Sequence, residues 1–78
     1  MLSYQQCKNI AVEALKEYGI EIDKAYSIGK DYVFEDSKEE HMGILPIVVS
    51  SKDGKCIGLW AYLNRYDMSM DDMRDIDF

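Results

Sequence analysis

The chain has 78 residues, is 47% hydrophobic and carries a net charge of −6. This length allows one small domain over 1–78, and the hydrophobic share argues against disorder throughout. The negative charge disfavours nucleic acid and anionic membrane surfaces as partners, and it favours basic protein surfaces.

Residues 3–18 have the pattern of an amphipathic helix. Ser3 and Gln6 have the spacing of a capping box, in which each side chain accepts a hydrogen bond from the other residue's backbone N–H. Gly19 can adopt the left-handed conformation that ends a helix. Apolar side chains recur along one stripe at helical spacing, at Cys7, Ile10, Ala11, Ala14, Leu15 and Tyr18. We therefore expect a helix with one buried face.

Four strands are predicted after this helix, at 24–29, 31–36, 44–50 and 55–62. Gly29 separates the first two of them. Asp53 and Gly54 lie between two apolar runs and predict a hairpin turn, because glycine accepts the positive φ that such turns require. Pro46 lies inside the third strand and cannot donate a backbone hydrogen bond, which predicts a sheet edge or a bulge there.

The acidic C-terminal segment, 66–78, contains five Asp residues and one Arg. Ser69 and Asp72 have capping-box spacing, which predicts a short helix near 69–76. Asp75 and Asp77 oppose the dipole at the end of this helix, so it should fray.

These elements predict an α+β domain. We expect the N-terminal helix to pack on a small, mostly antiparallel sheet of about four strands, with a short C-terminal helix. Cys7 and Cys56 are expected to be small buried hydrophobic residues rather than a disulfide pair. The chain has no apolar run near the ~20 residues of a membrane span and no signal-peptide pattern, so a cytoplasmic protein is expected.

The sequence shows no motif for catalysis, for metal binding or for phosphate binding. His41 is the only histidine and follows Glu39 and Glu40 in a polar loop, where we expect an exposed side chain rather than a metal ligand. A serine nucleophile would need His41 as its base, and Ser50 and Ser51 are better explained as strand-end and turn residues. We therefore expect no catalytic residue, no metal and no cofactor, in a protein that is not an enzyme.

The acidic C-terminal segment is the strongest candidate for a binding site. Its carboxylates would steer a basic partner, and its Met side chains adapt to varied surfaces. The alternative is a solvated, partly disordered terminus that aids solubility. A calcium loop is disfavoured, because Asp72 stands where the loop needs Gly and Phe78 where it needs Glu. The residues expected to contact a partner are Tyr62, Tyr66, Asp67, Asp71, Asp72 and Asp75.

Three aromatic residues follow the predicted fourth strand. Aromatic residues flanked by acids are common at interface hot spots. We expect Trp60 to close the core under the helix. For Tyr62 and Tyr66, a half-buried position and a partner contact both remain open.

The order of elements and two motifs resemble bacterial immunity proteins of polymorphic toxin systems. The resemblance covers roughly 5–60 and is strongest to the immunity protein thirty-five family. It rests on Tyr32, Val33 and Phe34, then on Gly43, Pro46, Ile47, Val48, Val49 and Gly54. The hairpin is also similar to small helix-plus-sheet domains found beside secreted peptidases. The first resemblance implies an inhibitor that binds a cognate toxin, with binding residues that vary with the toxin.

The sequence thus favours a small binding protein, a monomer or weak homodimer, whose protein partner is a basic toxin or nuclease domain. The alternative is an accessory or regulatory module that binds another protein through an open sheet edge near Pro46. An enzyme is a third, minor hypothesis.

Overall fold

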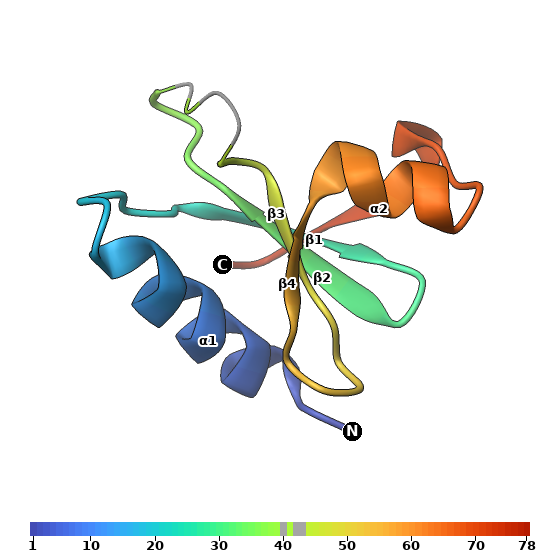
Figure 1. Cartoon of the computed structure of the whole chain (residues 1–78), viewed down its shortest axis with the longest axis horizontal. Helices are drawn as coiled ribbons and strands as arrows, with labels where there is room; N and C mark the ends of the chain where they lie inside the picture. Colours follow the sequence, from blue (N-terminus) through green and yellow to red (C-terminus); the bar gives the residue numbers. More distant parts are fainter. Residues whose placement is uncertain (40, 42–43) are drawn as a thin grey trace.

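The computed structural model describes residues 1–39, 41 and 44–78. Within these residues, two helices lie on opposite faces of one antiparallel sheet with the strand order β4-β3-β2-β1-β5 (Figure 1). This arrangement confirms the predicted α+β class. The elements are α1 (Tyr4–Lys16), β1 (Lys24–Ile28), β2 (Asp31–Glu35), β3 (Ile47–Val49), β4 (Cys56–Gly58), α2 (Leu59–Arg65), the 3₁₀ turn η1 (Met70–Asp72) and β5 (Met73–Ile76).

Helix α1 begins where the sequence predicts and ends at Lys16, two residues before the predicted end. Ser3 Oγ accepts from the Gln6 N–H at 3.2 Å, and Gln6 Oε1 accepts from the Ser3 N–H at 2.8 Å, so the capping box is confirmed. Gly19 has a φ of +68° after the last helical turn. Cys7, Ala11 and Leu15 form the buried stripe, which packs on one face of the sheet.

The sheet separates two hydrophobic cores, because side chains alternate between its faces. Ala25, Phe34 and Ile47 are aligned across three strands and belong to the core beside α1. Val33 and Val48 are aligned one position away and belong to the core beside α2. Strand β3 is therefore buried on both faces, which explains its continuous apolar sequence.

The predicted fourth strand ends at Gly58, and residues 59–65 form α2 instead. Leu59, Tyr62 and Leu63 have helical spacing and all lie in the core beside α2, so packing on this second face of the sheet favours the helix. The expectation for Trp60 was wrong. Its side chain is 66% exposed and so does not close the core.

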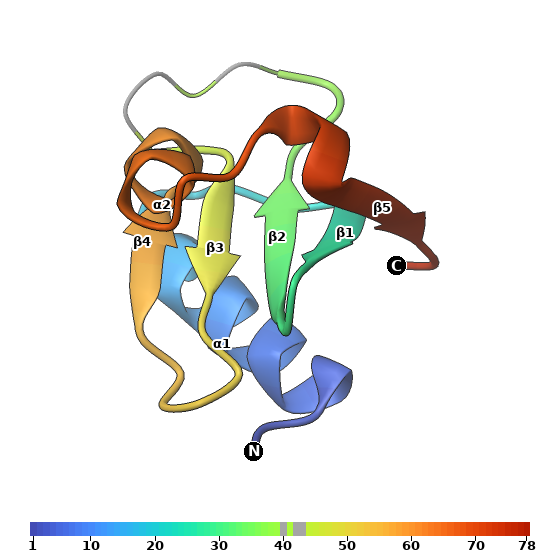
Figure 2. The ribbon, with the colours of Figure 1, turned by 90° about the vertical axis from the view of Figure 1, so that its right-hand side faces the viewer.

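The predicted C-terminal helix was also wrong, apart from its start. Ser69 and Asp72 form the expected capping box, but it opens only the short η1 turn. Residues 73–76 form β5, which pairs with β1 and satisfies the backbone groups of that edge. Figure 2 shows the chain crossing in front of the sheet from α2 to β5 at the opposite edge. Residues 73–76 of the acidic C-terminal segment are therefore a strand of the sheet.

Two expectations about β3 and β4 need correction. Strand β3 is interior, paired with β2 and β4, and Pro46 precedes it rather than marking an edge. The Pro46 carbonyl oxygen accepts a hydrogen bond from the Leu59 N–H at 3.0 Å, which connects the start of α2 to the residue before β3.

Both cysteines are free thiols. Cys7 is buried as expected, whereas Cys56 is exposed on the edge strand β4. No helix in the described ranges has the length and apolar character to cross a membrane.

Candidate functional site

A groove follows α2 on the face of the sheet opposite α1. It consists of two neighbouring cavities of about 550 Å³ and about 240 Å³, which share Glu35, Pro46 and Leu59 in their walls. We call it the α2 groove. Its other lining residues are Asp36, Glu39, His41, Ile44, Leu45, Gly58, Trp60 and Ala61 in the larger cavity, and Tyr26, Met70, Met73 and Asp75 in the smaller one.

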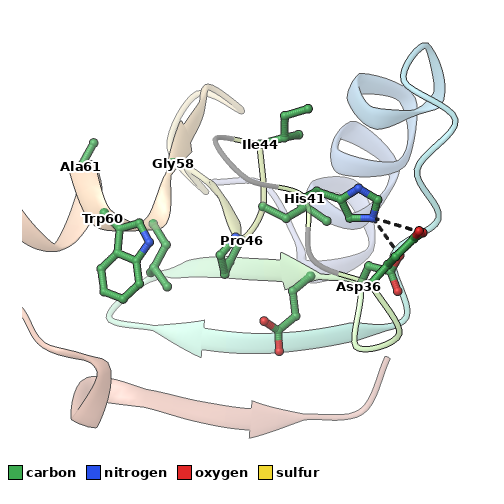
Figure 3. Close-up of a pocket in the computed structure, with 11 residues that line it drawn as sticks. Asp36, His41, Ile44, Pro46, Gly58, Trp60 and Ala61 are labelled. Carbon is green, nitrogen blue, oxygen red and sulfur yellow. Dashed lines mark hydrogen bonds and ion pairs between the residues drawn. The ribbon is translucent and has the colours of Figure 1, made fainter.

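Elements far apart in the sequence build the α2 groove. Glu35 faces it because side chains alternate along β2 and Val33, two positions earlier, already points toward α2. Asp75 is aligned with Tyr26 of β1 and so lies on the same face. In the larger cavity Trp60 and His41 lie on opposite sides, with Pro46 between them (Figure 3).

Large apolar side chains at the α2 groove are open to solvent. Trp60 lines the larger cavity, and Met70, which is 52% exposed, lines the smaller one. Tyr66 is also exposed, and its ring lies 4.7 Å from the ring of the buried Tyr62. Exposed Trp and Met beside a cavity indicate a surface that binds a partner.

The charged lining of the α2 groove is acidic. Four carboxylates line it, those of Glu35, Asp36, Glu39 and Asp75, and no Lys or Arg lines it in the part of the chain that the structure describes. Tyr26 Oη donates to Glu35 Oε1 at 2.6 Å, and burial, followed by this hydrogen bond, raises the pKa of Tyr26 to about 12. Because tyrosine is uncharged near neutral pH, the carboxylates determine the charge of the groove, which favours cationic groups.

Asp36, Glu39 and His41 meet at one end of the larger cavity. His41 Nε2 lies 3.0 Å from Asp36 Oδ2 and 4.0 Å from Glu39 Oε2. The hydrogen bond from His41, followed by one from the Lys38 N–H, lowers the pKa of Asp36. The expectation of an exposed His41 was wrong, because its side chain is only 18% exposed; Glu40 lies outside the described residues.

The predicted contact residues do not form one surface. Tyr62 is 5% exposed, and its Oη donates to Asp31 Oδ2 at 2.7 Å, so it is a structural residue rather than a surface contact. Asp72 Oδ2 accepts from the Ser69 N–H and caps η1. Asp67, Asp71 and Tyr66 are exposed around the chain that crosses from α2 to β5.

Of the six residues predicted to contact a partner, Asp75 alone is among the described residues that line the α2 groove. Sequence reasoning missed Glu35 and assigned Trp60 to the core, and it considered Met70 only as one of the Met side chains of the acidic C-terminal segment. The surface that these residues share exists only once α2 lies on the sheet. Sequence reasoning also missed Asp36 as a neighbour of His41. The spacing of Asp36, Glu39 and His41, with both carboxylates upstream of the histidine, was the available signal.

Comparisons of this chain with protein-family models, with curated proteins and with solved structures gave no match. The α2 groove is therefore the basis on which a function can be inferred.

Proposed function

We propose that this chain is a small non-enzymatic binding protein whose α2 groove binds a basic segment of a protein partner. One observation carries the proposal. Trp60 is largely exposed at a groove that is lined by four carboxylates and, among the described residues, by no Lys or Arg.

The groove combines two features that a basic protein segment requires. Leu59, Pro46 and the exposed Trp60 offer an apolar surface. A tryptophan that a partner covers at an interface often contributes about 2 kcal/mol or more to the free energy of binding. Carboxylates at the rim speed association with a basic partner by roughly 10–10³-fold at low salt. An apolar side chain flanked by Lys or Arg would fit this lining.

In its specific form, the proposal is that of an immunity protein that acts in the cytoplasm and neutralises a cognate toxin by occluding it. The resemblance of the hairpin and of the Tyr32-Val33-Phe34 strand to such proteins supports this form, as does the net charge of −6. A toxin that cleaves nucleic acid needs a basic cleft, and an acidic groove is complementary to one.

The alternative mode, strand addition at an open sheet edge, has less support. Pro46 motivated it, and Pro46 precedes an interior strand. The edge strands β4 and β5 have three and four residues, and β5 carries the charged Arg74 and Asp75. Short, charged edges disfavour pairing with another chain.

The test uses the wild-type chain to capture a partner from the source cell's lysate, followed by affinity measurements on that partner. Trp60→Ala removes the exposed aromatic ring, and Glu35→Gln with Asp75→Asn removes two charges from the groove. The matched controls are Tyr18→Ala, which removes an exposed ring elsewhere, and Glu13→Gln with Glu17→Gln, which removes two charges from the exposed positions of α1 and its C-cap.

We expect Trp60→Ala to weaken binding by about 30-fold or more, a factor that corresponds to about 2 kcal/mol. The double charge variant should slow association at low salt and lose this effect at high salt. Equal losses in the Tyr18→Ala control, or a partner without a basic contact surface, would contradict the proposal. For the immunity form, the captured partner must be toxic when expressed alone and harmless when expressed with this chain.

A further inference from the structure

We propose that Asp36, Glu39 and His41 form a binding site for a divalent zinc-type metal ion. One donor atom from each residue lies within 4.8 Å of the others. The site goes beyond the proposed function, and its test does not depend on whether the α2 groove binds a protein.

The distances in the cluster fit a metal of this size. A tetrahedral zinc ion with bonds of about 2.0–2.1 Å holds its donor atoms roughly 3.3 Å apart. His41 Nε2 lies 3.0 Å from Asp36 Oδ2 and 4.0 Å from Glu39 Oε2. One distance is slightly shorter and the other slightly longer than the separation of donor atoms around a zinc ion. The Glu39 side chain is 77% exposed and free to rotate inward, whereas Asp36 and His41 are largely buried.

The fold holds the Asp36 carboxylate in place. Asp36 directly follows β2, and its Oδ1 accepts from the Lys38 N–H at 2.9 Å, which leaves Oδ2 directed at His41. A carboxylate whose second oxygen is hydrogen-bonded is the usual arrangement around bound metals, because the outer contact fixes the ligand's orientation.

The chemistry of the donors favours one class of metal. An imidazole nitrogen suits Zn²⁺ and the neighbouring transition metals, whereas Ca²⁺ and Mg²⁺ prefer oxygen ligands alone. Two carboxylates and a neutral imidazole also balance the charge of a divalent ion. Three protein ligands leave a fourth position for water, and the adjoining cavity of about 550 Å³ has room for it.

The test is titration of the purified, metal-free chain with zinc chloride, followed by calorimetry and by thermal unfolding. We expect one equivalent of zinc to bind and to raise Tm, because a ligand that binds only the folded chain stabilises it. His41→Gln keeps a hydrogen-bond donor for Asp36 but removes the imidazole, and Asp36→Asn removes one charge of the cluster. Each should weaken zinc binding by at least about tenfold and abolish the rise in Tm.

Glu13→Gln is the matched control, because it removes an exposed carboxylate on α1 that is not part of the cluster, and it should leave zinc binding unchanged. Circular dichroism of each variant establishes that it is folded before titration. Magnesium chloride should not reproduce the rise in Tm. The proposal is overturned if the wild-type chain shows no saturable binding, or if folded His41→Gln binds zinc as tightly as the wild type.

Discussion

Tyr62 Oη donates a 2.7 Å hydrogen bond to Asp31 Oδ2, and this contact attaches α2 to the start of β2. The other carboxylate oxygen, Oδ1, accepts from the Ser51 N–H at 2.8 Å and from Ser51 Oγ at 3.3 Å. One carboxylate thus connects the β1–β2 turn, the β3–β4 hairpin and α2. Because α2 forms one wall of the α2 groove, Asp31 also helps to position the candidate site.

Loss of this contact should destabilise the fold. Tyr62→Phe keeps the buried ring but leaves Asp31 Oδ2 without its donor, and we expect the free energy of unfolding to fall by about 1.5–3 kcal/mol. Urea denaturation measures the change. Tyr66→Phe is the control, since Tyr66 is exposed and its substitution should cost less than about 0.5 kcal/mol. Equal effects of the two substitutions would show that the Asp31 contact contributes little.

Neighbouring residues of α2 should differ sharply in their effect on stability. Leu59 is fully buried, so Leu59→Ala should cost about 2–5 kcal/mol. Trp60, on the same helix, is 66% exposed, and Trp60→Ala should cost less than about 1 kcal/mol. Thermal or urea unfolding of both variants checks the orientation of α2. The reverse order would mean that Trp60, not Leu59, faces the sheet.

Alanine substitutions at three glycines should distinguish the stability cost of backbone strain from the cost of steric overlap. Gly54 has a φ of +74°, and an added Cβ would lie 2.9 Å from Ile10 Cδ1, whereas Gly19 has a φ of +68° and no atom within 4 Å of that position. We expect Gly19→Ala to cost about 1–2 kcal/mol from strain alone. Gly54→Ala should carry the same strain and a small further cost, roughly 1 kcal/mol or less, because the end of the flexible Ile10 side chain must shift to admit the Cβ.

Gly58→Ala provides the baseline for this series. Its φ is −63° and nothing lies within 4 Å of an added Cβ, so the cost should stay below about 1 kcal/mol. Urea denaturation of the three variants gives the order. A cost at Gly54 no larger than that at Gly19 would contradict the close packing of the hairpin on α1.

Stability should fall in alkali because of Tyr26. Burial and the Glu35 hydrogen bond raise the pKa of Tyr26 from 10.0 to about 12. Between these values the unfolded chain has lost the proton that the folded chain keeps, so the free energy of unfolding decreases as pH rises. The contribution is fully present below pH 10 and is lost by about pH 12.

Urea unfolding at pH 9 and at pH 11 measures this dependence. Tyr26→Phe has no titrating group at this position, so its stability should fall less between the two pH values than that of the wild type. Burial and the bond to Asp31 also raise the pKa of Tyr62, and the residual slope in Tyr26→Phe should come in part from that group. Identical slopes in the two proteins would contradict the Tyr26–Glu35 contact.

Most elements that depend on local interactions could be predicted from the sequence. The Ser3–Gln6 capping box, the buried stripe of α1 and the left-handed Gly19 involve residues a few positions apart. The β1 and β2 strands and the hairpin with its positive-φ Gly54 follow from alternation and from turn chemistry in the same way. The acidic charge of the chain, and hence the expectation of a basic partner, needs no structure at all.

Tertiary contacts decided the rest. The apolar run after Cys56 is short, and its period suits a strand or a helix equally well; α2 forms because Leu59, Tyr62 and Leu63 can cover the second face of the sheet. Residues 73–76 become a strand because β1 offers an unpaired edge, which no local pattern reveals.

The candidate site depends on the same long-range contacts. The sequence by itself determined which side chains are acidic or aromatic, and it identified Asp75 and His41 as residues to consider. That Asp75 shares a groove with Trp60 was decided only when α2 came to lie against the sheet. The contact of His41 with Asp36, by contrast, joins residues five positions apart in the chain. Charge and local propensity are properties of the chain, whereas a binding surface is a property of how distant segments pack together.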